Sequence, residues 1–260
     1  MEAFALDIAD GVARVRFTQG ARGNPFDATS CAELSLVATE CDAGPAVRSV
    51  LITAEGRFFS VGGDLASLGE SREGLGRFIK NATVGFHSGV SRFARMDAPT
   101  VVAVHALAAG GGVSLVAACD FAIAARSATF YAAYPAIGLT VDGGGSYYLP
   151  RRVGTRRATA FYLRNETWTA EQALEYGLIS EVVDDEDLAA AAADLAAELA
   201  SGPTRAYGSV KNLLLASSQS TLEGQLELEA REMARIGATD DAWNAINAVA
   251  RKERPGFEGR

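Results

Sequence analysis

Apolar and polar residues alternate with a period of two in the first part of the chain. One alternating run covers residues 4–8 and a second covers residues 12–17, and Asp10 and Gly11 stand between them. An Asp-Gly pair between two such runs is typical of a two-residue hairpin turn. The sequence therefore predicts a β-hairpin at the start of the chain.

Continuous apolar runs predict two further strands, at residues 50–53 and 101–104. A strand that is apolar at every position is expected to be buried on both faces, as in a parallel sheet. Each of these runs leads into a glycine-rich segment and then a helical pattern. This repeated order predicts an α/β fold built as a spiral of βα turns.

Two helices are expected between these strands. Asp27 is a candidate N-cap for the first helix, because its side chain can accept a hydrogen bond from the first turn. The second helix is predicted to be long, from about residue 71 to residue 96, with an apolar stripe through Phe78, Val84 and Phe93. From Leu188 onward, helical spacing of Ala, Leu, Glu and Arg predicts terminal helices.

The run from residue 101 to residue 125 is almost wholly apolar and is long enough to resemble a membrane span. Three consecutive glycines and Asp120 interrupt it, so a buried strand followed by a buried helix is the better interpretation. A buried acid needs a partner, and Arg126 is the candidate for Asp120.

Charge and cysteine content narrow the classes of function. The 32 acidic residues outnumber the 24 basic ones, which argues against nucleic acid or an anionic membrane as the main partner. The three cysteines form no CxxC pair and have no nearby histidine at ligand spacing, so neither a disulfide framework nor a metal site is predicted. The N-terminus lacks the basic region of a secretion signal, and a cytoplasmic location is expected.

Two glycine-rich segments are the most informative part of the sequence. Residues 56–65 read GRFFSVGGDL, and three glycines follow at residues 110–112, at the mouth of an apolar helix. Glycines let a main chain approach a ligand closely, and the first N–H groups of a helix have no intrahelical acceptor. Two such segments can direct two amides at one oxygen, which is the arrangement of an oxyanion hole.

The wording and spacing of these segments resemble the crotonase (enoyl-CoA hydratase/isomerase) superfamily, and the resemblance covers nearly the whole chain. It implies that the amides of Gly63 and Gly111 polarise the carbonyl of an acyl-CoA thioester. It also implies a crotonase-like spiral of ββα turns over residues 1–200 and a helical oligomerisation region over residues 201–260. A homotrimer or homohexamer is expected, with coenzyme A present only as part of the substrate and no other cofactor.

The hydratases of this superfamily use two glutamates to activate water. The matching positions here are Ser114 and Tyr134. A serine hydroxyl needs an activating partner before it can act as a base, and a tyrosine is protonated by default. Simple hydration of an enoyl thioester is therefore not the expected reaction.

Asp142, followed by three glycines, is the main candidate for chemistry. It could simply cap the next helix. By resemblance it also matches the proton-shuttling aspartate of epoxyphenylacetyl-CoA and dienoyl-CoA isomerases, and the nucleophilic aspartate of 4-chlorobenzoyl-CoA dehalogenases. In the dehalogenase pattern His87 would activate water and Tyr134 would replace a tryptophan, although a lone histidine on a long helix is often only a packing group.

Contacts with coenzyme A are also suggested by the resemblance. The candidates are Arg22, Asn24, Val61, Asp64 and Lys252. For Asp64 the simpler interpretation is that it caps the following turn.

The sequence thus favours an acyl-CoA isomerase in which one carboxylate, Asp142, moves a proton while the two amides stabilise an enolate. Two alternatives stay open. One is a hydratase-like enzyme or an aryl-CoA dehalogenase or hydrolase with Asp142 as nucleophile and His87 as base. The other is a non-catalytic acyl-CoA-binding protein that kept the oxyanion hole.

Overall fold

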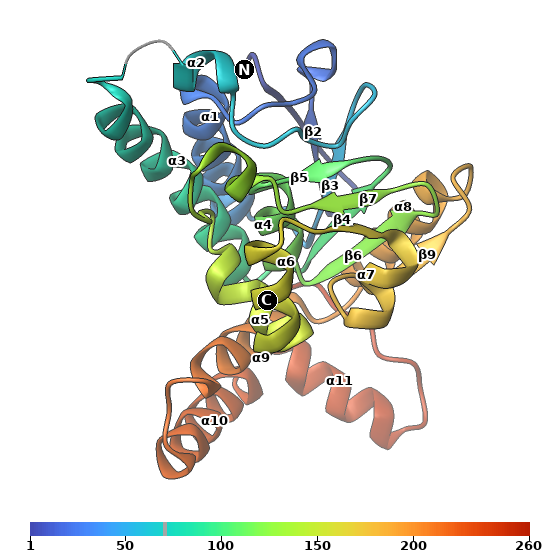
Figure 1. Ribbon diagram of the computed structural model, residues 1–260. Helices are drawn as coiled ribbons and strands as arrows, with labels where there is room; N and C mark the ends of the chain where they lie inside the picture. Colours follow the sequence, from blue (N-terminus) through green and yellow to red (C-terminus); the bar gives the residue numbers. More distant parts are fainter. Residues whose placement is uncertain (70–71) are drawn as a thin grey trace.

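The computed structural model describes residues 1–69 and 72–260 and shows a mixed α/β fold, as predicted (Figure 1). Within the described residues the main sheet has six strands in the order β1-β2-β3-β4-β6-β9. Its first two strands are antiparallel and every later pair is parallel. The strands are β1 (Phe4–Ala9), β2 (Val12–Phe17), β3 (Ser49–Ala54), β4 (Thr100–Val104), β6 (Phe121–Ala125) and β9 (Glu181–Val183).

The predicted hairpin and both predicted apolar strands are confirmed. Asp10 and Gly11 form the hairpin turn with φ values of 52° and 79°, the left-handed conformation that a tight two-residue turn requires. A smaller sheet has the order β5-β7-β8. Its strands are β5 (Ala108–Ala109), β7 (Thr129–Tyr131) and β8 (Thr167–Thr169).

The helices follow the strands in sequence. They are α1 (Ala28–Ala43), α2 (Leu65–Gly69), α3 (Leu75–Arg95), α4 (Gly111–Ala118), α5 (Gly145–Val153), α6 (Thr155–Leu163), α7 (Ala170–Tyr176), α8 (Leu188–Ala200), α9 (Thr204–Ser217), α10 (Leu222–Gly237) and α11 (Asp240–Ala250), with short 3-10 turns η1 (Gly20–Arg22) and η2 (Tyr134–Ile137). The apolar run that resembles a membrane span divides into β4, β5, α4 and β6. No helix in the described part of the chain is long and apolar enough to cross a membrane.

The predicted cap of α1 is confirmed. The Asp27 carboxylate accepts a hydrogen bond from the Ser30 N–H at 2.8 Å, and the Ser30 hydroxyl oxygen accepts one from the Asp27 N–H. This reciprocal capping box fixes where α1 begins.

The long helix α3 agrees with the prediction only in part. Residue 71, its expected start, lies outside the described residues, and the helix ends at Arg95. Phe93 is buried, but Val84 is 71% exposed, so its assignment to the buried stripe was wrong. The buried face runs through Phe86 and Val90, and Val84 lies about 200° around the helix from Phe86.

Two glycines bring α3 very close to α1. A Cβ on Gly85 would lie 2.5 Å from the Cys31 carbonyl oxygen, and a Cβ on Gly89 would lie 2.8 Å from Leu34 Cγ. Only glycine permits this approach without a shift of one helix. The close crossing sets the position of Phe86 and His87, which lie between the two glycines.

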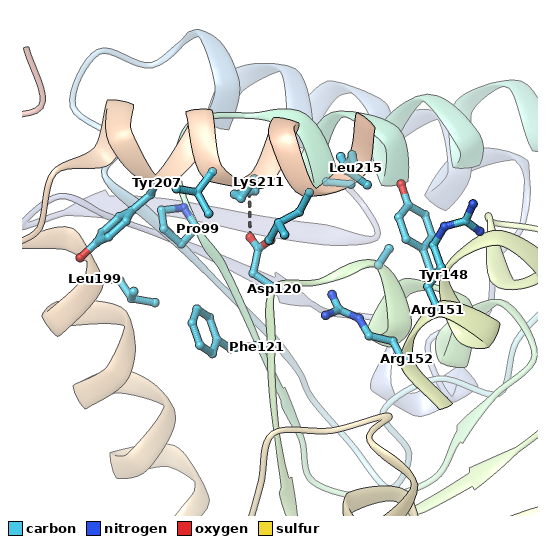
Figure 2. A pocket seen from close by; sticks show the side chains of 14 residues that line it. Pro99, Asp120, Phe121, Tyr148, Arg151, Arg152, Leu199, Tyr207, Lys211 and Leu215 are labelled. Atoms are coloured by element: carbon cyan, nitrogen blue, oxygen red, sulfur yellow. Dashed lines mark ion pairs between the residues drawn. The ribbon is translucent and has the colours of Figure 1, made fainter. Parts of the chain in front are cut away.

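Asp120, whose side chain is largely but not fully buried, pairs with Lys211, and the prediction of Arg126 as its partner was wrong. Lys211 Nζ lies 2.8 Å from Asp120 Oδ2 (Figure 2). It also donates hydrogen bonds to the carbonyl oxygens of Phe93 and Ala98. Arg126 instead pairs at the surface with Asp184. The reason is geometric: β6 separates residues 120 and 126, and a strand of this length spans roughly 16 Å.

Lys211 therefore attaches α9 to the start of strand β6, close to a cavity of about 650 Å³ that Leu199, Tyr207 and Leu214 help to line. The predicted boundary after residue 200 falls between α8, which packs on the sheet, and this helix. Figure 1 shows α10 and α11 extending from one end of the molecule, opposite α2.

Candidate active site

The two glycine-rich segments lie side by side and run in the same direction. Ser60 and Ala108 form a parallel β-bridge, in which the Ala109 N–H donates to the Ser60 carbonyl at 2.9 Å. Gly63 and Gly111 each stand three residues beyond a member of this bridge. The pairing therefore carries both glycines to the same end of the two segments.

The amides of Gly63 and Gly111 are left free of hydrogen bonds to the part of the chain that the structure describes. The neighbouring Asp64 N–H, in contrast, donates to the Phe26 carbonyl. Gly111 is the first residue of α4, where an N–H has no intrahelical acceptor and the helix dipole favours negative charge. The predicted convergence of the two amides on one thioester oxygen stays a prediction.

Glycine is required at this junction by the closeness of the main chains. A Cβ on Gly62 would lie 2.9 Å from the Ala109 carbonyl oxygen, and a Cβ on Gly111 would lie 3.0 Å from the ring of Phe26. The Gly110 backbone has φ 51°, a value that side chains disfavour.

Asp142 lies in the loop between η2 and α5. The residue that caps α5 is Gly144, and the Asp142 carboxylate instead accepts a hydrogen bond at 2.7 Å from the Tyr134 hydroxyl. The interpretation of Asp142 as a helix cap was therefore wrong. Burial raises the pKa of Asp142, and the Tyr134 hydrogen bond opposes that rise, as a positive charge on His87 would.

Tyr134 connects this carboxylate to the second glycine segment. Its ring lies 3.7 Å from the position that a Cβ on Gly110 would occupy. Its hydroxyl lies 3.2 Å from Ser114 Oγ on α4, and Ser114 is fully buried. Burial raises the pKa of Tyr134 well above its usual value, so the phenol stays protonated.

His87 reaches the same loop from α3. Its Nε2 accepts a hydrogen bond at 3.1 Å from the N–H of Gly143, the residue after Asp142. An acceptor nitrogen carries no proton, so this bond selects the neutral ring with its hydrogen on Nδ1. The structure thus brings together Gly111, Tyr134, Asp142 and His87 at one site.

Four of the predicted coenzyme A contacts form a second group. Arg22 bridges two carboxylates, with nitrogen–oxygen distances of 2.8 Å to Asp27 and 3.2 Å to Asp64. Asp64 also accepts hydrogen bonds from the N–H and hydroxyl of Ser67, as expected for a residue that caps a turn. Val61 lies against Gly23, whose added Cβ would be 2.7 Å from Val61 Cγ1.

Asn24 is buried within this group and holds the chain together. Its Nδ2 donates to the carbonyl oxygens of Glu55, Phe58 and Phe59. Its Oδ1 has no hydrogen-bond partner among the described residues. A role toward coenzyme A stays a prediction for all four of these residues.

Lys252 does not belong to the group. It follows α11, which Figure 1 places at the opposite end of the molecule from α2. Its side chain is exposed. Its predicted contact with coenzyme A stays a prediction.

Sequence reasoning missed the direct contacts that connect these residues. The hydroxyls of Tyr134 and Ser114 were recognised only as replacements for two acids. Because those two acids act together on one water, the match itself is a signal that the two hydroxyls lie close together. The bond from Gly143 to His87 has no signal in the sequence. No group of three or more His, Cys, Asp or Glu side chains in the described residues is arranged to hold a metal ion.

Comparison with known proteins gives a consistent result. The family model described as enoyl-CoA hydratase/isomerase matches residues 7–260. The chain is 34% identical over 261 residues to the 1,2-epoxyphenylacetyl-CoA isomerase of Escherichia coli K12, covering 100% of both chains. It is 34% identical over 231 residues to 4-chlorobenzoyl coenzyme A dehalogenase-2 of an Arthrobacter species, covering 88% of this chain and 83% of the relative.

A solved structure agrees over the same length. The crystal structure of an enoyl-CoA hydratase from Polaromonas sp. JS666 superimposes with a TM-score of 0.92 at 27% identity. It covers 98% of this chain and 99% of its own. The similarity in fold therefore extends over both the strands that carry the glycine segments and the terminal helices.

Proposed function

This chain belongs to the enoyl-CoA hydratase/isomerase family, and from that premise we propose that it is an acyl-CoA isomerase. The amides of Gly63 and Gly111 would hold the thioester carbonyl oxygen. Two N–H donors on this oxygen stabilise the negative charge that develops when the α-carbon loses a proton. The electron pair of the broken C–H bond then spreads into the carbonyl as an enolate.

Asp142 is the residue that moves the proton. Its carboxylate would take the proton from one carbon of the acyl group and return it to another, which shifts a double bond and leaves the atoms of the substrate unchanged in number. A carboxyl whose pKa is raised by burial is better suited to hold the proton between these two steps than an ordinary aspartate.

One observation carries this proposal: the Asp142 carboxylate lies beside the second glycine segment, and among the described residues its side-chain hydrogen bond comes from a hydroxyl, that of Tyr134. By resemblance to the hydratases, Tyr134 and Ser114, whose hydroxyls contact each other, stand where two acids would direct water. Addition of water to a double bond normally needs a base and an acid, whereas a proton shift needs one movable proton.

A second candidate is displacement or hydrolysis on an aryl-CoA, with Asp142 as nucleophile and His87 as base. The relative named as a dehalogenase and the position of His87 beside the Asp142 loop support it. Against it, the lone pair of His87 Nε2 is engaged by the Gly143 N–H. This bond must open before His87 can accept a proton from water.

Asp142→Asn tests both enzymatic candidates, because it keeps the size of the side chain and removes the base. Assays would use a panel of enoyl-, dienoyl- and aryl-CoA thioesters, followed by ultraviolet absorbance. Turnover should fall by about two powers of ten or more while thioester affinity changes little. Full activity in this variant would contradict both and favour an acyl-CoA-binding protein.

His87→Gln and isotope labels separate the two candidates. An isomerase would lose little activity and would take solvent deuterium into its product. An enzyme with an aspartate nucleophile would accumulate a covalent adduct in this variant, and its wild type would place solvent oxygen-18 in the product.

A further inference from the structure

The hydrogen bonds around Asp142 have a fixed direction. The Tyr134 hydroxyl has one hydrogen, and it donates that hydrogen to Asp142 Oδ1 at 2.7 Å. The contact between Ser114 Oγ and the Tyr134 oxygen, at 3.2 Å, must therefore take its hydrogen from Ser114. Both hydrogens point toward the carboxylate.

A third hydroxyl lies behind these two. Tyr162, on α6, has a buried hydroxyl that makes no hydrogen bond within the described part of the chain. A Cβ on Gly145 would lie 2.5 Å from Ser114 Oγ and 2.6 Å from the Tyr162 oxygen, so the two hydroxyls border the same point. Burial raises the pKa of Tyr162, and the neighbouring Ser114 hydroxyl opposes that rise.

We infer that Tyr134 and Ser114 form a hydroxyl relay that positions the Asp142 carboxylate and favours its ionised form. They act through Asp142 and are positioning residues. The Tyr162 hydroxyl lies next to Ser114, at the far end of this relay. The relay occupies Oδ1, so Oδ2 is the oxygen without a side-chain donor among the described residues. This inference rests on the proposed function, in which Asp142 accepts and returns the proton.

The relay explains how one carboxylate can serve both steps. While Tyr134 holds Oδ1, a proton taken from the substrate forms its O–H bond at Oδ2. The same atom then gives the proton back when the enolate carbon forms its new C–H bond. The carboxyl does not have to rotate between the steps, because the hydrogen bond at Oδ1 persists throughout.

The other titratable groups that face Asp142 do not provide a competing charge. Cys31, on α1, is buried, and burial with the nearby Asp142 raises the pKa of its thiol to about 12. Tyr162 stays a neutral phenol for the same reasons. His87, on α3, is held as an acceptor by Gly143. Among the described side chains, the neutral hydroxyl of Tyr134 is therefore the group that donates a hydrogen bond to the Asp142 carboxylate.

The inference is tested by titrating Asp142 directly, which requires no substrate. The protein would be labelled with carboxyl carbon-13 aspartate, and comparison with Asp142→Asn would assign the Asp142 signal in the spectrum. Tyr134→Phe removes the donor to Oδ1 and should raise the pKa of Asp142 by about one pH unit or more. Ser114→Ala should shift it in the same direction by less, since it acts one hydroxyl further away.

Tyr148→Phe is the matched control. The Tyr148 ring lies 2.8 Å from a Cβ built on Gly144 in the same loop, and its hydroxyl makes no hydrogen bond within the described residues. The same loss of a hydroxyl should leave the titration of Asp142 unchanged. If Tyr134→Phe fails to fold, Ser114→Ala carries the test. An unchanged Asp142 titration in every folded relay variant overturns the inference.

A double variant distinguishes a relay from two separate effects. Because Ser114 acts through Tyr134, Tyr134→Phe with Ser114→Ala should titrate as Tyr134→Phe alone. In an active assay, the acidic limb of the kcat/KM profile should move to higher pH with little change in KM. Additive shifts in the double variant overturn the relay. Full activity in Asp142→Asn instead overturns the proposed function and leaves the titration result standing.

Discussion

Asp142 is held in the fold at a cost in stability. Burial raises the pKa of this carboxyl above its ordinary value of 3.8, so the folded state binds the proton more tightly than the unfolded chain does. The folded state therefore loses stability as pH rises through 3.8 toward the folded pKa, and it regains that stability in acid.

This sign gives a prediction for Asp142→Asn that is independent of activity. The variant removes the buried charge and keeps an acceptor for Tyr134, so it should have a higher melting temperature than wild type near neutral pH. The difference should shrink as pH falls below about 4, where wild-type Asp142 is protonated in both states. Calorimetry across this pH range makes the measurement, and a neutral-pH loss of stability in the variant would contradict the assignment.

Lys211 gives the strongest prediction for stability. Lys211→Met keeps an apolar stem and removes the charge, which leaves Asp120 without its cation at a largely buried position. We expect the free energy of unfolding in urea to fall by about 3 kcal/mol. The double variant with Asp120→Asn should recover part of the loss. A loss below about 1 kcal/mol in Lys211→Met would show that the pair contributes little.

The sequence could not identify this pair. Asp120 was recognised as a buried acid, but the nearby Arg126 was assigned as its partner because only local separation can be measured in a sequence. The partner comes from α9, about ninety residues later, and is chosen by how the helix packs on the sheet. Buried ion pairs between distant elements are set by tertiary packing.

The position of His87 depends on the close crossing of helices α1 and α3. Gly89→Ala would place a methyl group 2.8 Å from Leu34 Cγ and should destabilise the fold by about 1–3 kcal/mol. Gly76→Ala, in the same helix, is the matched control because no heavy atom lies within 4 Å of its added Cβ. Chemical denaturation of both variants tests the crossing, and equal effects would argue against it.

The paired glycine segments predict the position of the substrate. In a complex with an acyl-CoA, the thioester oxygen should lie about 3 Å from both the Gly63 and the Gly111 nitrogen. Crystallography of such a complex tests this directly. A thioester oxygen that contacts neither amide would contradict the central part of the proposed function.

Turns and helix ends that depend on the preferences of single residues could be predicted from the sequence. The buried face of a helix was harder to predict, because it depends on which neighbouring element packs against it. The Asp10-Gly11 turn and the Asp27 cap follow from conformations that single residues prefer. Val84 was misplaced because the stripe on α3 was assigned from apolar character alone. The buried face is set by where α1 touches α3, and the glycines at this contact do not contribute to an apolar stripe.

At the scale of the whole molecule, the terminal helices expose large apolar side chains. Leu214 is 70% exposed, Met233 is 76% exposed and Trp243 is 66% exposed, on α9, α10 and α11 respectively. Val210, Leu214 and Met233 line one shared groove between α9 and α10, and a contiguous exposed apolar patch of this kind marks an interaction surface. We propose that these helices pack between copies of the chain in a homotrimer or homohexamer.

Light scattering at micromolar concentration tests this assembly. The wild-type mass should correspond to three or six chains, and Trp243→Glu should lower it, because a buried charge at the contact is costly. The variant should keep the circular dichroism of the wild type, since Trp243 is exposed within one chain. A monomeric wild type would contradict the proposal.

The oxyanion-hole candidates are N–H groups of the main chain. Side-chain substitutions can therefore change how the protein handles a proton without removing the groups proposed to bind the carbonyl oxygen. A substitution at residue 114, 134 or 142 alters the group that handles the proton, but it leaves the amides of Gly63 and Gly111 in place. If these amides bind the thioester carbonyl as proposed, new side chains can be tested while that binding is kept. The relatives named as isomerase and dehalogenase illustrate how far the chemistry of similar chains diverges. Engineering of this chain toward another thioester reaction should begin at those three positions.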